Sequence, residues 1–251
     1  MEKRDANWKG TNCSRIEFQS TIGSRREITK LKRPIVIAID GTSASGKSTT
    51  SKMLAKMLGM VYVDTGAMYR TLAWHCLRNH IEVTNARAVA TTCRKWKTSL
   101  ECAEQHVRLL VEGVLPGAEL RSSEVSAATS HIAVVPKVRE WMKKKQRECI
   151  QFGDLVMEGR DIGTNVFPET DFKFYLDAHL EERARRRAAE GVIENLAARD
   201  QRDSQRAAAP LMIALGARVV NTSHLTIPDA CQLIIEDLRK KGAKLEPEPA
   251  G

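Results

Sequence analysis

The stretch Gly41-Thr42-Ser43-Ala44-Ser45-Gly46-Lys47-Ser48 follows the pattern G-x-x-x-x-G-K-[ST]. Residues 35–39, directly before it, form an almost wholly apolar run rich in β-branched side chains, which is typical of a buried strand. Residues 47–58, directly after it, carry apolar side chains at helical spacing. A strand, a glycine-rich loop and a helix in this order predict a loop that binds phosphate groups.

The residue types in this loop suit the binding of a nucleoside triphosphate. Gly41 and Gly46 let the backbone come close to phosphate oxygens, and successive amides together with the helix N-terminus attract negative charge. We expect Lys47 to reach the outer phosphates and the Ser48 hydroxyl to bind Mg²⁺. A glycine turn before an ordinary helix is the alternative, which a full eight-position match disfavours. The expected ATP-binding residues are Gly41, Thr42, Ser43, Ala44, Ser45, Gly46, Lys47, Ser48 and Thr49.

Length and composition exclude several classes of protein. The chain has 251 residues and 42% hydrophobic residues, which is enough for one α/β core with small insertions. No apolar run approaches the roughly 18 residues of a membrane-spanning helix, and no secretory signal is apparent. The six cysteines form no C-x-x-C pair, which favours reduced thiols in the cytoplasm over disulfides or a zinc site.

The net charge of +9 invites the hypothesis of a nucleic-acid partner, but its distribution weakens that hypothesis. Residues 1–33 hold nine basic and four acidic residues, while the remainder holds 31 basic and 27 acidic ones. Aromatic residues make up 5% of the chain, too few for a base-stacking surface. We therefore expect no nucleic-acid partner, and interpret residues 1–33 as a disordered basic extension without an essential function.

Four further short apolar runs predict strands at residues 61–63, 155–157, 172–176 and 217–221. Helices are expected at residues 65–77, 136–152, 180–190 and 227–240, with Thr65 as the cap of the first of these. Residues 80–135 break this alternation, with helical stretches at 86–97 and 123–132 around a strand at 106–111. The tail after residue 241 is rich in Pro and Glu, and we expect it to fray.

Three longer motifs identify a family. They are Asp64-Thr65-Gly66-Ala67-Met68-Tyr69-Arg70, Glu158-Gly159-Arg160-Asp161-Ile162-Gly163-Thr164, and Arg199-Asp200-Gln201-Arg202-Asp203-Ser204-Gln205-Arg206. Together with the phosphate-binding loop they resemble the bacterial cytidylate kinase family, in the nucleoside monophosphate kinase group, over roughly residues 34–240. These motifs are far more specific than the phosphate-binding loop alone.

The resemblance implies a P-loop three-layer α/β fold. We expect a sheet of five parallel strands in residues 34–241, an inserted acceptor-binding (NMP-binding) domain at about residues 80–135, and a short lid at about residues 183–206. It implies an enzyme that transfers the γ-phosphoryl group of ATP to CMP or dCMP with Mg²⁺. We further expect a monomer in the cytoplasm.

The resemblance also implies roles for individual residues. Asp161 matches a residue that accepts a hydrogen bond from the cytosine amino group, which uracil lacks. The implied acceptor-binding residues are Thr65, Arg70, Ser130, Arg139, Arg160, Asp161, Arg199, Asp203 and Arg206. The implied catalytic residues are Lys47, Arg160, Arg186, Arg187 and Arg206.

Some alternatives stay open at this point. Arg70 and Arg139 fit solvated surface positions, Ser130 fits an ordinary helix position, and Asp161 fits a turn cap. Asp203 fits a plain ion-pair partner of its arginine neighbours. A kinase for UMP or AMP, or a nucleic-acid-dependent NTPase, shares the same phosphate-binding loop.

The chain also departs from the family pattern at two places. Only residues 188–198 separate Arg187 from Arg199, which is short for the family's lid. In the phosphate-binding loop, Thr42 and Ala44 replace the usual Pro and Gly, and we expect the backbone cradle to survive because Thr42 can adopt the φ of Pro.

Overall fold

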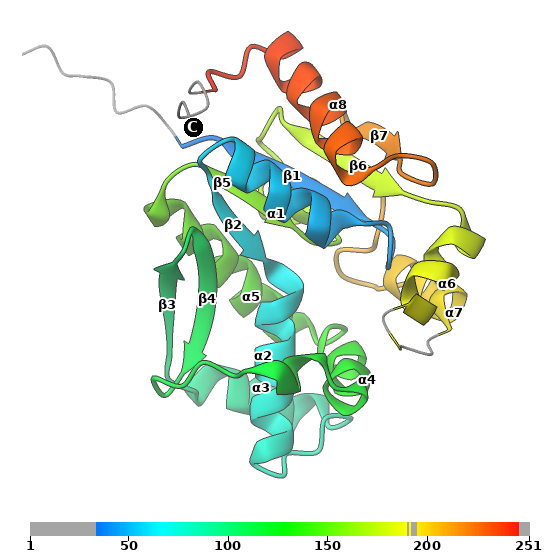
Figure 1. The fold of residues 1–251 in the computed structure, drawn as a ribbon. Helices are drawn as coiled ribbons and strands as arrows, with labels where there is room; N and C mark the ends of the chain where they lie inside the picture. The colour runs from blue at the N-terminus through cyan, green and yellow to red at the C-terminus, as the bar shows by residue number, and fades with distance from the viewer. Residues whose placement is uncertain (1–33, 190, 192–194, 246–251) are drawn as a thin grey trace, which may run out of the picture. The chain divides into compact units, whose positions relative to one another are not determined.

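The computed structural model describes residues 34–189, 191 and 195–245, which form a three-layer α/β arrangement (Figure 1). The expectations for residues 1–33 and for the end of the tail lie outside these residues. Within the described part of the chain, no helix is long and apolar enough to cross a membrane. The same residues contain no cluster of three or more His, Cys, Asp or Glu side chains that could hold a metal ion.

The described residues form a seven-stranded sheet in the order β3-β4-β2-β5-β1-β6-β7. All neighbouring strands run parallel except β3 and β4. The expectation of five strands was therefore wrong by two, although the five expected parallel strands are all present. The strands are β1 (Val36–Gly41), β2 (Val61–Asp64), β3 (Thr98–Ala103), β4 (His106–Val111), β5 (Leu155–Glu158), β6 (Lys173–Asp177) and β7 (Arg218–Asn221).

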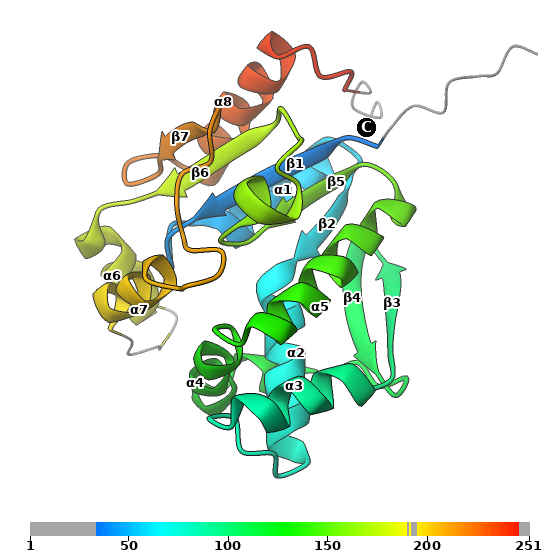
Figure 2. The same ribbon diagram turned by 180° about the vertical axis from the view of Figure 1, so that it is seen from behind.

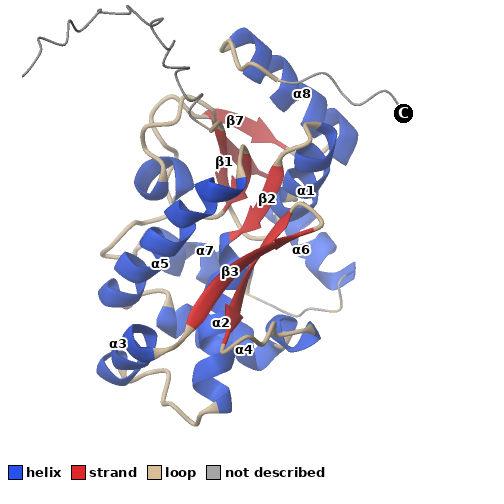
Figure 3. Cartoon of the chain, turned by 90° about the vertical axis from the view of Figure 1, so that its left-hand side faces the viewer, coloured by secondary structure: helices blue, strands red, loops and turns tan. Residues whose placement is uncertain are grey.

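The two additional strands are a hairpin that continues the main sheet past β2. The strand expected at residues 106–111 is β4, and Tyr62 and Val63 of β2 pair with its first two residues. Its partner β3 was missed because the two-residue turn, Glu104 and Gln105, has φ of 51° and 56°. Such turns usually carry Asn-Gly, so the sequence lacks the ordinary hairpin signal. Figure 3 views the sheet from this β3 edge.

Helices cover both faces of the sheet, because the side chains of its central strand alternate between two cores. Ile37 and Ile39 of β1 pack with α1 and α8, whereas Val36 and Ala38 pack on the opposite face with α2 and α5 (Figures 1 and 2). The helices are α1 (Lys47–Met57), α2 (Thr65–Arg78), α3 (Ala86–Lys95), α4 (Ser123–Ile132), α5 (Pro136–Glu148), α6 (Leu180–Ala189), α7 (Leu196–Ser204) and α8 (Ile227–Lys240). The short helical turns are η1 (Ala118–Arg121), η2 (Cys149–Phe152) and η3 (Ile162–Val166).

The cap of α2 differs from the expectation that Thr65 would cap it. The residue before the helix, Asp64, has an extended backbone, and its Oδ1 accepts the N–H of Ala67 at 2.8 Å. Thr65 is already the first helical residue, and its hydroxyl donates instead to the carbonyl of Glu158 at 2.7 Å. An Asp cap also places negative charge at the positive end of the helix, which favours this arrangement.

The parallel strands bring their carboxyl ends to one edge of the sheet. Asp64 at the end of β2 is level with Glu158 at the end of β5, and Gly41 at the end of β1 is level with Leu176 of β6. Ligands of open parallel sheets bind at this edge. The fold therefore gathers the loop after β1 and the motifs after β2 and β5 into one region.

Candidate active site

Two glycines shape the phosphate-binding loop between β1 and α1. Gly41 has φ of 147°, and a Cβ added there would lie 1.9 Å from the Leu176 carbonyl oxygen, so no other residue fits. Gly46 precedes α1 in the left-handed region at φ 83°. The two positions that the sequence pattern singles out are therefore those where a side chain is sterically excluded or strained.

Ala44, which replaces the usual Gly of the family, also lies in the left-handed region, at φ 59°. A residue with a Cβ pays roughly 1–2 kcal/mol for this conformation. The phosphate-binding loop therefore keeps its conformation at Ala44, at the cost of local backbone strain.

The loop is held in place by hydrogen bonds from neighbouring strand ends. The Thr42 hydroxyl donates to Asp177 Oδ1 at 2.7 Å, and the Thr222 hydroxyl donates to the Ser45 carbonyl at 2.8 Å. Ser45 Oγ donates back to the Thr42 carbonyl at 3.0 Å. Thr42 thus anchors the loop with a bond that Pro could not make, in keeping with the expectation that the cradle tolerates it.

Lys47 begins α1 and is 5% exposed. Its Nζ donates to the Thr42 carbonyl at 2.5 Å and to Ser45 Oγ at 3.4 Å, so the ammonium lies within the loop. Burial raises the pKa of the Asp40 and Glu158 carboxyls, and the Lys47 charge opposes part of this rise in each. A buried cation at the N-terminus of a helix is a strong site for an anion such as phosphate.

Ser48 lies beside a buried carboxylate that the sequence analysis did not single out. Its hydroxyl donates to Glu158 Oε2 at 2.9 Å, while the Tyr62 hydroxyl donates to Glu158 Oε1. Burial, together with the charge of Asp64, raises the pKa of Glu158. A hydroxyl and a carboxylate are hard oxygen ligands of the kind that Mg²⁺ prefers, so Ser48 and Glu158 fit a magnesium ion.

Arg70 and Asp64 form an ion pair beside this carboxylate, with Nη2 and Oδ2 at 2.8 Å. Burial alone would raise the pKa of Asp64, but Arg70 and the Ala67 amide outweigh burial and hold this pKa below its ordinary value. The Arg70 Nε is buried and has no hydrogen-bond partner among the described residues. Arg70 is therefore not a solvated surface arginine, and it has a donor to offer to a ligand.

The turn after β5 is fixed to β1 by Asp40. This buried carboxylate accepts the N–H groups of Ile162 and Gly163, both at 2.8 Å. Burial raises the pKa of Asp40 to about 6, although the two amides work against the shift. The turn that carries Arg160 and Asp161 is thereby tied to the strand that leads into the phosphate-binding loop.

Asp161 pairs with Arg139 of α5 at 2.6 Å, and both side chains are at most 10% exposed. Burial would lower the pKa of Arg139, but Tyr69 and Asp161 outweigh it and raise this pKa. The guanidinium also lies over the Tyr69 ring, 5.8 Å from its centroid. Arg139 is thus buried rather than on an outer helix face, and it shares a site with Asp161.

A second ion cluster joins the turn after β5 to α7. Asp203 Oδ2 accepts from Arg160 Nε at 2.9 Å, and Asp203 Oδ1 accepts from Arg206. Burial lowers the pKa of Arg206, in part offset by Asp203. The structure therefore brings together Arg160, Asp203 and Arg206, as the sequence predicts, and shows Asp203 as an ion-pair partner of both arginines.

The arginines of α6 contact the phosphate-binding loop. Arg187 Nη2 donates to Ser43 Oγ at 3.3 Å, and Arg186 Nη1 lies 3.5 Å from the Ala44 carbonyl oxygen. Arg183, which the predicted site omits, is 7% exposed and bonds both the Ser43 carbonyl and Asp200 Oδ2, at 3.2 and 2.5 Å. The sequence could have indicated Arg183, because its spacing places it on the same helical face as Arg186 and Arg187.

Two expected residues are not joined to the others by these contacts. Ser130 lies within α4 and donates to the Ser126 carbonyl of its own helix at 3.5 Å. The side chain of Arg199 lies outside the described part of the structure. The residues that the sequence analysis missed are Asp40, Glu158, Arg183 and Asp200, of which the first two are acidic residues at or next to strand ends.

Replacing Ala44 by Gly should stabilise the fold. Glycine removes the Cβ strain at φ 59°, so we expect a gain of about 0.5–1 kcal/mol in the free energy of unfolding, measured in urea. The matched control is Ala184→Gly at an exposed position inside α6, which should lose about 1 kcal/mol. A loss in both variants would contradict the strain at Ala44.

Asp40 should give stability an inverse dependence on pH. Its pKa is about 6 in the fold and about 3.9 when unfolded, so its contribution is full below pH 4 and is lost as pH rises through 6. Between pH 7 and pH 5 the wild type should gain about 1 kcal/mol relative to Asp40→Asn. Urea unfolding of both proteins at the two pH values measures this difference, and a difference that does not change with pH would contradict it.

Comparison with known proteins shows the family of this chain. A sequence profile of the cytidylate kinase family matches residues 37–240. A cytidylate kinase of Caldanaerobacter subterraneus is 40% identical over 217 residues, which cover 82% of this chain and 95% of that protein. A cytidylate kinase of Anoxybacillus flavithermus is 39% identical and covers 82% of this chain and 96% of that protein.

Solved structures are more distant. A putative kinase from Chloroflexus aurantiacus is 15% identical, covers 84% of this chain and 98% of that one, and has a TM-score of 0.43. This value is too low to bear on the fold or the site. The profile match and the 40% identity over most of both chains show that this chain belongs to the cytidylate kinase family and is a nucleotide-binding kinase.

Proposed function

We propose that this enzyme transfers the γ-phosphoryl group of ATP to CMP or dCMP, giving ADP and CDP or dCDP. The observation that carries the proposal is the Asp40 bridge, which joins the strand before the phosphate-binding loop to the turn bearing Arg160 and Asp161. The phosphate-binding loop suits a triphosphate, and the turn bearing Arg160 and Asp161 suits a pyrimidine monophosphate. Membership of the cytidylate kinase family supports both assignments.

ATP would bind through residues 41–49. The loop amides and the N-terminus of α1 would donate hydrogen bonds to its phosphate oxygens. Lys47 would exchange its bond to the Thr42 carbonyl for the outer phosphates. Ser48 and Glu158 would hold Mg²⁺. Bound Mg²⁺ neutralises charge on the β- and γ-phosphates.

The acceptor would bind at the turn after β5 and the helices around it. Asp161 would accept from the cytosine amino group, with Arg139 and Ser130 beside the base. Thr65, Arg70 and Arg160 would bind at the acceptor phosphate, and Arg199, Asp203 and Arg206 at the sugar and phosphate. Asp203 already orients both Arg160 and Arg206, so their guanidiniums keep a fixed geometry.

No protein base is needed, because the acceptor phosphate is already anionic at neutral pH. Catalysis then rests on positioning the two nucleotides and neutralising charge on the transferred group. Arg186 and Arg187 approach the phosphate-binding loop from α6, which is where a lid would deliver positive charge. The remaining positive charge comes from Arg160, Arg206 and Lys47.

We also propose a monomer, since the motifs assigned to ATP and to the acceptor all lie within this one sequence. We propose a cytoplasmic location, which the free thiols of the five cysteines in the described part of the chain support.

An acceptor panel tests the proposal. In a coupled assay with ATP and Mg²⁺, CMP and dCMP should be phosphorylated faster than UMP or AMP. Lys47→Met should lower turnover by about a hundredfold or more, because it removes a cation that would neutralise negative charge on the transferred phosphoryl group. Lys56→Met, at an exposed position of the same helix, is the control and should leave turnover unchanged. No reaction with any pyrimidine monophosphate, or full turnover in Lys47→Met, would contradict the proposal.

A further inference from the structure

A hydrogen-bonded chain reaches Asp161 from the side of α5 and has no role in the function proposed so far. Lys143 Nζ donates to Asn165 Oδ1 at 3.1 Å, and Asn165 Nδ2 donates to Asp161 Oδ2 at 2.8 Å. The backbone closes the same unit, since the Asn165 N–H donates to the Asp161 carbonyl at 2.9 Å. Lys143, Asn165 and Asp161 thus form a relay that ends on the proposed base-reading carboxylate.

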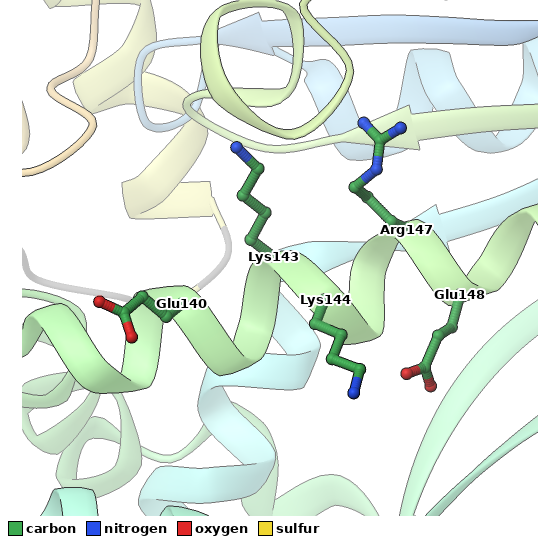
Figure 4. Close-up of a pocket in the computed structure, with 5 residues that line it drawn as sticks. All are labelled: Glu140, Lys143, Lys144, Arg147 and Glu148. Carbon is green, nitrogen blue, oxygen red and sulfur yellow. The ribbon is translucent and has the colours of Figure 1, made fainter.

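The relay fixes which way the Asn165 amide faces. Lysine has only donors and a carboxylate has only acceptors, so the amide oxygen must face Lys143 and the NH₂ must face Asp161. Figure 4 shows Lys143 pointing to one side of α5 and Lys144 pointing to the other. Only Lys143 therefore takes part, and its neighbour provides a natural control.

Both donors to the Asp161 side chain use the same oxygen. Oδ2 accepts from Arg139 at 2.6 Å and from Asn165 at 2.8 Å. Within the described residues, Oδ1 accepts no hydrogen bond. Asp161 is 7% exposed, so a turn of the carboxylate would leave buried donors without a partner, which costs free energy. The two bonds therefore lock the carboxylate with Oδ1 as the oxygen left for a ligand.

We propose that Asn165, oriented by Lys143, is a positioning residue that sets the preference for cytosine over uracil. This inference rests on the proposed function. With Asp161 locked, a cytosine amino group meets an acceptor, whereas a uracil carbonyl meets an oxygen that repels it and cannot turn away. Without Asn165, the carboxylate is held by Arg139 alone and can turn to tolerate uracil.

The test compares kcat/KM for CMP and UMP in variants with matched size. Asn165→Leu keeps the branched shape and the number of side-chain heavy atoms and removes both bonds, so the CMP/UMP ratio should fall about tenfold, the value expected from one lost bond to a charged group. KM for CMP should rise while KM for ATP stays unchanged. Lys143→Met should change the ratio in the same direction by a smaller factor, and Lys144→Met should leave it at the wild-type value.

A second variant protects the test against misfolding. Asn165→Asp keeps the size and the contact with Lys143 but places an acceptor against Asp161, so its CMP/UMP ratio should also fall. An unchanged ratio in Asn165→Leu, or in Asn165→Asp if the leucine variant does not fold, overturns the inference alone. Equal increases of KM for CMP and ATP would show a merely structural role and also overturn it. A wild-type enzyme that does not phosphorylate CMP overturns the proposed function and the inference together.

Discussion

The two hydrogen bonds from Ile162 and Gly163 to the buried carboxylate of Asp40 are the constraint on which the site depends. Asp40 is the second-last residue of β1, and the last residue, Gly41, opens the phosphate-binding loop. The amides belong to the turn that follows β5. Sheet register alone would bring these segments to the same edge, but it would not fix the direction of the turn. The Asp40 bonds fix it, at the cost of burying a carboxylate with a raised pKa.

Buried charge at this edge is compensated pair by pair. Arg139 pairs with Asp161, Arg160 and Arg206 share Asp203, and Arg183 pairs with Asp200. Such pairs contribute little net stability, because desolvation offsets their attraction. Their value lies in geometry, since each carboxylate holds its guanidinium in a fixed orientation. A site that must neutralise a transferred phosphoryl group gains from cations that need not reorganise.

Sequence reasoning predicted the parts of this site that depend on local pattern. The phosphate-binding loop, the five parallel strands and the helices at their ends follow from glycine spacing and apolar periodicity. The β3–β4 hairpin was missed because Glu104-Gln105 does not resemble a turn that needs positive φ. Asp40, Glu158 and the Lys143–Asn165 contact were missed because they join segments more than 20 residues apart. The spacing of residues along the chain does not reveal contacts between such distant segments. Lys143 also lies in a run of three lysines, which on a helix is typical of a solvated face.

The central claim is that one chain holds ATP and a cytidine monophosphate end to end across the Asp40 bridge. Calorimetric titration with a bisubstrate analogue, adenosine and cytidine joined by five phosphates, tests it most directly. The account predicts one analogue bound per chain, with a Kd far below that of either ATP or CMP, because one molecule gains both sets of contacts with a single loss of translational freedom. A Kd no lower than that of ATP alone, or an affinity unaffected by excess CMP, would contradict it.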